Sequence, residues 1–314
     1  MPELPEVEII ARQLREEVVG RRITQARVLW DRAVQAMEAR AFEADVAERA
    51  IIGVGRRAKY LLLTLGAADG VAATDDSAPA AGSAMPTDLA ANVTDATNDA
   101  DERVLIIHRR MSGNVILVGP DELAAGAEAF DPYTRVDFTL DDGWHLVFSD
   151  PRKFGRVALI TPDALPAYFA AIGPEPLEAA FTAEALSARL ANRRGPIKAT
   201  LLDQSVIAGL GNIYADEALF RARIHPLRPA NSLTPDELRA LRDGIQGALE
   251  TGVAHGGVTF GRHRDIHNEA GTNLAHVEAY QRTGQPCLRC GAPIRRIVVG
   301  QRGTHYCPEC QRLP

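Results

Sequence analysis

Four cysteines near the end of the sequence stand in two pairs whose spacing suits a metal ion. Cys287 and Cys290 form one Cys-x-x-Cys pair, Cys307 and Cys310 form the other, and sixteen residues separate the pairs. Each pair can hold Zn²⁺ from a tight turn, and two pairs complete a closed tetrahedral shell without an open position. We therefore expect one structural zinc. The alternatives to a zinc site are two redox-active pairs or a chance pattern.

The beginning of the sequence, Met1-Pro2-Glu3, could carry covalent chemistry. If Met1 is removed, Pro2 exposes a secondary amine that titrates far below a lysine ammonium and is partly neutral at physiological pH. A neutral amine can attack C1′ of a sugar and form an iminium, with Glu3 and Glu6 as acid and base beside it. Many chains begin with Met-Pro, however, and carboxylates favour helix N-termini for electrostatic reasons alone.

The net charge of −6 over 314 residues argues at first against a nucleic-acid partner. Residues 67–102 contain eight acidic residues and no Lys or Arg, so the rest of the chain carries +2. This segment is rich in Ala, Thr, Gly and Asp, and it offers little apolar surface to offset its ordering entropy. We expect residues 67–102 to be a disordered acidic insertion rather than a folded lid over the substrate.

Outside that segment, basic residues gather in five clusters beside predicted turns, which favours a track that binds phosphate groups. Any single cluster could instead be an ordinary solvated surface. The clusters are Arg56, Arg57 and Lys59; Arg109 and Arg110; Arg152, Lys153 and Arg156; Arg193, Arg194 and Lys198; and six Arg in residues 281–314, among them Arg302.

The elements that must position these groups fall into three regions. A helix is expected over 5–19, followed by short antiparallel strands to about residue 160, with 60–65 and 104–107 as neighbours in one sheet. From residue 182 the pattern is helical, and Thr234 with Glu237 forms a capping box. The predicted helices cover 182–191, 197–202, 212–222 and 234–251, and 294–299 with 304–306 suit a two-stranded ribbon.

These regions predict an α+β fold with three domains, at 1–163, 177–279 and 280–314. A normal apolar content of 46% supports a buried core. The sequence has no apolar run long enough for a membrane span and no signal-peptide pattern at its start, so we expect a cytoplasmic protein. We also expect it to be a monomer.

Six separate segments point to one family. They are residues 1–8 (MPELPEVE), 57–60 (RAKY), 108–113 (HRRMSG), 150–155 (DPRKFG), 209–215 (GLGNIYA) and the cysteine pairs. In this order they resemble the formamidopyrimidine-DNA glycosylases, bacterial enzymes of base-excision repair. The related endonuclease VIII is less similar, because it has Gly at the position of Leu4 and lacks the Arg-x-Phe element. The resemblance covers nearly the whole chain except 67–102.

The resemblance implies a β-sandwich, a helix–two-turn–helix region and a zinc finger that together hold damaged double-stranded DNA near the bacterial nucleoid. It assigns Pro2 as the Schiff-base nucleophile and Glu3 as the acid that protonates the sugar ring oxygen. It implies a phosphate clamp of Lys59, His108, Asn212 and Arg302. We expect Lys59 also to be a catalytic residue, with Pro2, Glu3 and Glu6, and Lys198 to belong to the same DNA track. Met111, Arg152 and Phe154 would fill the space that an everted nucleotide leaves. Without the motif, Met111 and Phe154 would be read as core residues.

The sequence departs from the family pattern in two further places. Arg109 and Arg110 stand where Leu-Gly is usual, and residues 261–278 lack the landmarks of the segment that caps the everted base. Three histidines there, His263, His267 and His276, could suggest a metal but are more simply solvated. The expected activity is removal of oxidised purines followed by β,δ-elimination. A same-fold enzyme for oxidised pyrimidines or abasic sites, and a non-catalytic DNA-binding protein, remain the alternatives.

Overall fold

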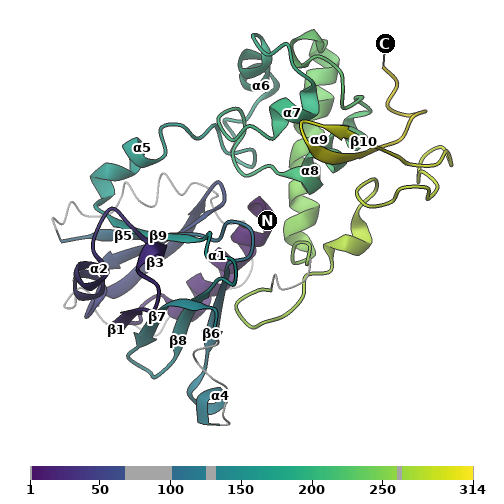
Figure 1. Ribbon diagram of the computed structural model, residues 1–314. Coiled ribbons are helices and arrows are strands. Elements are labelled where there is room, and N and C mark those ends of the chain that lie inside the picture. The colour runs from purple at the N-terminus through teal and green to yellow at the C-terminus, as the bar shows by residue number, and fades with distance from the viewer. Residues whose placement is uncertain (1, 68–100, 125–131, 260–263, 314) are drawn as a thin grey trace, which may run out of the picture. The chain divides into compact units, whose positions relative to one another are not determined.

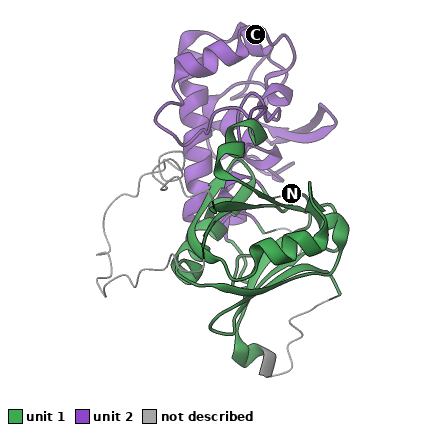
Figure 2. Cartoon of the chain, turned by 90° about the vertical axis from the view of Figure 1, so that its left-hand side faces the viewer, with its two compact units in different colours: residues 1–2, 6–169, 259–271 green, residues 3–5, 170–258, 272–314 purple. Residues whose placement is uncertain are grey.

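The computed structural model places the chain in two compact units, each assembled from separate stretches of sequence (Figure 1, Figure 2). Unit 1 comprises residues 1–2, 6–169 and 259–271, and unit 2 comprises residues 3–5, 170–258 and 272–314. The structure describes residues 2–67, 101–124, 132–259 and 264–313. The expected disordered insertion therefore lies outside the described residues, apart from its ends.

Unit 1 is a β-sandwich of a four-stranded and a five-stranded sheet. The first has the order β1-β7-β8-β6 and the second the order β2-β9-β5-β4-β3, with all pairs antiparallel except β2 with β9. The strands are β1 (Ile23–Val28), β2 (Val34–Gln35), β3 (Ala50–Arg57), β4 (Tyr60–Gly66), β5 (Arg103–His108), β6 (Asn114–Val118), β7 (Thr134–Leu140), β8 (His145–Ser149) and β9 (Arg156–Ile160).

The leading helix α1 (Leu4–Val18) closes the core of this sandwich. Val7, Ile10, Leu14 and Val18 are spaced three or four residues apart, so they share one face. All four are at most 1% exposed and pack in the same cluster as the apolar side chains of both sheets. The described residues of this unit contain five further helical segments: η1 (Asp31–Ala33), α2 (Ala39–Val46), α4 (Pro120–Ala124), η3 (Pro162–Ala164) and α5 (Leu165–Tyr168).

The strands β4 and β5 pair as predicted, from Tyr60 opposite His108 to Leu65 opposite Arg103. The last two residues of the range 67–102 belong to the fold rather than to a disordered segment. Asp101 accepts hydrogen bonds from Arg49 at its carbonyl and its carboxylate, and Glu102 is 3% exposed.

Unit 2 contains a helical region, and two of its helices begin at side-chain caps, of which the sequence predicts the one at Thr234. Thr234 and Glu237 form the predicted capping box at the start of α9. Thr182 accepts a hydrogen bond from the Ala185 N–H at the start of α6. The helical elements are α6 (Ala183–Leu190), α7 (Ile197–Leu201), α8 (Asn212–Ala222), η4 (Ala230–Ser232), α9 (Pro235–Ala254) and η5 (Asn273–His276). Among the described residues, no helix has the length and apolar character that crossing a membrane requires.

A two-stranded ribbon completes unit 2. β10 (Arg295–Val299) and β11 (Arg302–Tyr306) pair antiparallel, as the sequence predicts. The apolar side of the ribbon is small: Ile294 packs with Cys287, Cys307 and Phe220 of α8. The expected α+β class, with a leading helix, a β-sandwich, a helical region and a four-cysteine ribbon, is confirmed.

Candidate functional site

Glu3 lies in unit 2, with its carboxylate against the start of α8. Oε1 accepts a hydrogen bond from the Ile213 N–H at 3.0 Å and Oε2 accepts one from the Tyr214 N–H at 3.4 Å. The first amides of a helix lack partners within the helix, and the helix dipole favours a negative charge there. The helix that begins at Asn212 therefore anchors the carboxylate of Glu3, a residue that is 3% exposed.

Two glycines before α8 make room for this contact. A Cβ on Gly211 would lie 2.3 Å from Cδ of Glu3, and a Cβ on Gly209 would lie 2.7 Å from Cβ of Leu4. Gly209 also has φ of +76°, which a larger residue adopts only at a cost. The Leu4 N–H donates to the Gly209 carbonyl at 3.0 Å. The segment 209–211 thus leaves room for Glu3 and Leu4 and binds the backbone of Leu4.

Lys198 lies inside unit 2 rather than at its surface. Its ammonium pairs with the carboxylate of Asp216 and donates to the Asn212 carbonyl at 3.0 Å, and its side chain is fully buried. Burial lowers the pKa of Lys198, while the negative charge of Asp216 opposes this shift. The other oxygen of Asp216 accepts from the backbone N–H of His305. In this arrangement Lys198 supports the start of α8, whereas the sequence suggests a lysine in the DNA track.

Asn212 and Arg302 come together at the same end of α8. The Asn212 side-chain amide donates to the carbonyl of Gly303 at 3.0 Å, next to the exposed Arg302 at the start of β11. The ribbon is therefore attached directly to the first residue of the helix.

Lys59 and His108 lie close together in unit 1. Lys59 is in the turn from β3 to β4, directly before Tyr60, which stands opposite His108 across β4 and β5. The rings of Tyr60 and His108 have centroids 4.3 Å apart. Burial, together with the positive charges of Arg110 and Lys59, lowers the pKa of His108 from 6.5 to about 3. His108 is therefore neutral at physiological pH in the free protein.

Met111 and Phe154 are exposed, which rules out core packing for both. Met111 is 42% exposed and Phe154 is 46% exposed, although both are large apolar side chains. The guanidinium of the exposed Arg152 lies 4.8 Å from the centroid of the Phe154 ring, a cation–π distance. Such side chains are available to a partner.

A buried carboxylate, Asp150, joins the two loops that carry these side chains. Its Oδ1 accepts from the Ser112 hydroxyl, next to Met111, and from the Arg152 N–H at 3.2 Å. Its Oδ2 accepts from the Gly155 N–H at 2.6 Å. Asp150 itself is 0% exposed. The side chain of Asp150 thus fixes the loop of Met111 relative to the loop of Arg152 and Phe154.

Pro2 and Glu6 belong to unit 1 and are both buried. Glu6 stands in the first turn of α1. Burial lowers the pKa of the fully buried Arg109 to about 10, while the negative charge of Glu6 acts in the opposite direction and favours the charged guanidinium. Glu3 and Glu6 thus have different environments, the start of α8 for Glu3 and a guanidinium for Glu6.

The four cysteines converge as the spacing predicts. Their Sγ atoms all lie within 4.8 Å of one another, with 3.9 Å between Cys287 and Cys310 and 3.4 Å between Cys290 and Cys307. Sulfurs at about 2.3 Å from a tetrahedral Zn²⁺ would be close to these separations. Backbone N–H groups of Arg289 and Cys310 point at two of the sulfurs, which would support thiolates. The donor set fits zinc.

Sequence reasoning missed the supporting groups Asp150, Asp216 and Arg109. Asp150 belongs to the motif at 150–155, but only Arg152 and Phe154 of that motif were assigned roles. Asp side chains commonly accept hydrogen bonds from the backbone of turns, so the type of Asp150 alone could have indicated this support. The partners of Asp216, and the partners Glu6 and Arg264 of Arg109, are distant in sequence, so no local pattern indicated them.

Comparison with known proteins gives consistent results along the whole chain. Three family models match: the formamidopyrimidine-DNA glycosylase N-terminal domain over residues 1–157, its H2TH domain over 172–263, and a zinc finger found in FPG and IleRS over 284–313. A formamidopyrimidine-DNA glycosylase of Roseiflexus is 45% identical over 313 residues, covering 99% of this chain and 100% of the relative.

Solved structures of Lactococcus lactis Fpg are also similar to this chain. One is a complex with DNA that contains N7-benzyl-Fapy-dG, at 32% identity and a TM-score of 0.80. Another is a complex with DNA that contains an oxidised pyrimidine, at 31% identity and a TM-score of 0.80. Each alignment covers 99% of this chain and 100% of the bacterial one.

Proposed function

This chain belongs to the formamidopyrimidine-DNA glycosylase family, and we propose that it excises oxidised purines from double-stranded DNA and then cleaves the strand at the abasic site. The observation that carries this proposal is the anchored Glu3 next to Pro2, in a chain that matches the family over its full length. A protein that only bound damaged DNA would not need that pair. The place of action would be the bacterial nucleoid, with the protein acting as a monomer.

Pro2 is the nucleophile of this proposal once Met1 has been removed. Its neutral amine attacks C1′ of the damaged nucleotide, the C1′–base bond breaks, and the base leaves with a proton. Glu3 protonates the ring oxygen, the sugar opens, and an iminium forms between Pro2 and C1′.

The iminium then acidifies the sugar C2′ position. β-Elimination expels the 3′ phosphate, δ-elimination expels the 5′ phosphate, and hydrolysis returns the amine of Pro2. Glu6, in the first turn of α1, and Lys59 are the remaining candidates for proton transfer in these steps.

Residues of each unit bind DNA in this proposal. Lys59 and His108 in unit 1, and Asn212 and Arg302 in unit 2, bind backbone phosphates. Met111, Arg152 and Phe154 enter the duplex where the damaged nucleotide leaves the stack. Lys198 contributes indirectly, by holding the Asn212 carbonyl and Asp216 in place.

One Zn²⁺ held by Cys287, Cys290, Cys307 and Cys310 has a structural role in this proposal. Bound there, the metal supplies cross-linking rather than chemistry, because four thiolates leave no position for a substrate. The ribbon that it holds carries Arg302 and the carbonyl that binds Asn212.

Borohydride trapping tests the proposal. The protein and a duplex with a single formamidopyrimidine or 8-oxoguanine lesion should form a covalent complex, and peptide mapping should place the adduct on Pro2. The undamaged duplex is the control. An adduct on Lys59 or Lys198 would contradict the assignment.

A parallel series with oxidised-pyrimidine and preformed abasic duplexes tests the range of lesions. The Lactococcus lactis complex with an oxidised pyrimidine is the observation that keeps this second substrate class open. Faster trapping on the pyrimidine duplex than on the purine duplexes would favour it.

A further inference from the structure

Arg109 is a fully buried arginine that joins three segments of unit 1. It is 2% exposed. Its Nε donates to the Gly113 carbonyl at 2.9 Å, Nη1 donates to the Glu6 carbonyl at 3.3 Å, and Nη2 donates to Oδ1 of Asn114 at 2.8 Å and to the Arg264 carbonyl at 3.3 Å. Four of its five N–H groups are thus used.

The three segments differ in their expected tasks. Residues 109–113 form a turn closed by the Gly113 N–H donating to the Arg109 carbonyl, and this turn carries the exposed Met111. Glu6 lies in the first turn of α1, four residues after Pro2. Arg264 begins the described part of the segment that follows residues 260–263, which lie outside the described residues.

Residues 264–269 form a docked turn. The Asp265 carboxylate accepts from the N–H groups of His267 and Glu269, and so closes the turn on itself. From α1, the Gln13 amide donates to the other oxygen of Asp265 at 2.8 Å. From β6, the Leu117 N–H donates to the Ile266 carbonyl at 2.9 Å, and the Ile266 side chain is 0% exposed.

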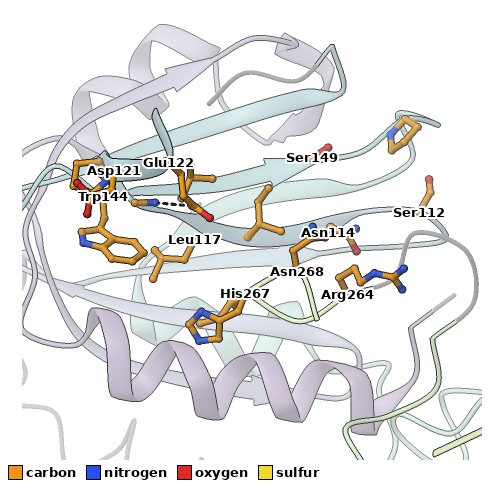
Figure 3. Close-up of a pocket in the computed structure, with 16 residues that line it drawn as sticks. Ser112, Asn114, Leu117, Asp121, Glu122, Trp144, Ser149, Arg264, His267 and Asn268 are labelled. Atoms are coloured by element: carbon orange, nitrogen blue, oxygen red, sulfur yellow. Dashed lines mark hydrogen bonds between the residues drawn. The ribbon is translucent and has the colours of Figure 1, made fainter. Parts of the chain in front are cut away.

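This turn forms one wall of a cavity of about 890 Å³ (Figure 3). Strand β6 and Trp144 line the cavity further along, and Ser112 and Asn114 lie toward the end where Arg264 is found. Ser112 directly follows Met111. Arg109 therefore connects the wall made by the docked turn with the loop that carries Met111.

We propose that Arg109 is a positioning residue that fixes the docked turn 264–269 relative to the Met111 loop. Base excision then depends on Arg109, whereas the later strand cleavage does not. This inference rests on the proposed function. One of the segments that converge on Arg109 is the first turn of α1, four residues after the proposed nucleophile Pro2, and in this inference the base attached to the attacked sugar lies beside them. A preformed abasic site has no base, so its cleavage needs the amine but not this wall.

The chemistry of the guanidinium explains why another residue would not substitute. A planar donor can serve four acceptors in different directions, which a lysine ammonium or an apolar side chain cannot. Removing it leaves three carbonyl groups and an amide oxygen without this donor, and the segments become free to shift. Displacements of about 1 Å near a reacting centre can reduce rates by about 100-fold.

The experiment compares two reactions of each variant: excision of an 8-oxoguanine base under single-turnover conditions, and cleavage of a preformed abasic duplex. Arg109→Leu should lower the excision rate constant about tenfold or more, with less than about a twofold change in abasic cleavage. Arg109→Lys should recover part of the loss. Gln13→Ala, which loosens the same turn from its other side, should lower excision alone, and the double variant should lose less than the product of the two effects.

Arg15→Leu is the matched control. Arg15 also stands on α1 and donates two hydrogen bonds, but both go to the Val54 carbonyl, in β3. The Arg15→Leu variant should leave the ratio of the excision rate to the abasic-cleavage rate unchanged. If Arg109→Leu does not fold, Arg109→Lys and Gln13→Ala carry the test.

Equal losses in both reactions, or no loss in either, would overturn the role of Arg109. A wild-type protein that performs neither reaction would instead refute the proposed function.

Discussion

Replacing His108 by glutamine should remove a defined part of the acid sensitivity of unit 1. In the folded protein burial and the charges of Arg110 and Lys59 lower the pKa of His108 to about 3, against 6.5 for the unperturbed side chain. Below pH 6.5 His108 therefore binds a proton in the unfolded chain, whereas in the folded chain it stays neutral until the pH approaches 3. Stability falls as the pH falls through this range, and the loss is complete near pH 3.

The magnitude follows from the difference between the two pKa values. Each pH unit between the unfolded and folded values costs about 1.4 kcal/mol. From neutral pH to pH 5 the interval below 6.5 is 1.5 units, so the free energy of unfolding should fall by about 2 kcal/mol from this group alone. Because pH 5 lies well above the folded value, the result depends almost entirely on the unfolded value.

Urea unfolding followed by tryptophan fluorescence measures this directly. Both tryptophans of the chain, Trp30 and Trp144, lie in unit 1, so the signal reports the unit that contains His108. The His108→Gln variant loses ring contact with Tyr60 and should be less stable at pH 7.5, but its loss between pH 7.5 and pH 5 should be about 2 kcal/mol smaller than that of the wild type. Acid effects on other groups are common to both proteins and cancel. An equal loss in the two proteins would refute the reasoning.

Three further predictions concern the supports of the site. Asp150→Asn should lower lesion excision about tenfold and the stability of unit 1 by about 1–3 kcal/mol, because the amide cannot accept all three hydrogen bonds at once; unchanged excision would contradict the linking role. Cys290→Ser should release zinc in a chelator assay and weaken DNA binding while the tryptophan signal of unit 1 stays native; full affinity without metal would contradict this. Replacing residues 68–100, which carry six acids, by a short Gly-containing linker should tighten non-specific DNA binding at low salt, and the gain should fade as screening shortens to roughly 10 Å at 0.1 M; lost strand cleavage would argue for a role in catalysis.

Local sequence patterns predicted the elements well where a specific cap or period was present. Thr234 and Glu237 mark the start of α9 because their side chains satisfy free amides of that helix, and the spacing of Val7, Ile10 and Leu14 marks the buried face of α1. The paired cysteines likewise determine a geometry by themselves.

Contacts between distant residues could not be predicted in this way. Glu3 binds the amides of residues more than 200 positions later, and no local pattern encodes that partner. In the sequence Lys198 resembles part of a basic surface because Arg193 and Arg194 precede it. In the structure its ammonium forms a buried ion pair with Asp216. Charge clusters in sequence do not distinguish an exposed cation from one whose acid lies on another helix.

The place of residues 3–5 has a consequence for dividing the molecule into parts. These three residues belong to unit 2, although the residues on both sides of them belong to unit 1. A fragment that starts at residue 170 would keep every helix of unit 2 but would leave the amides of Ile213 and Tyr214 and the carbonyl of Gly209 without Glu3 and Leu4. The helical part is therefore not a transferable module, and grafting it onto another protein would require a peptide that supplies the same contacts.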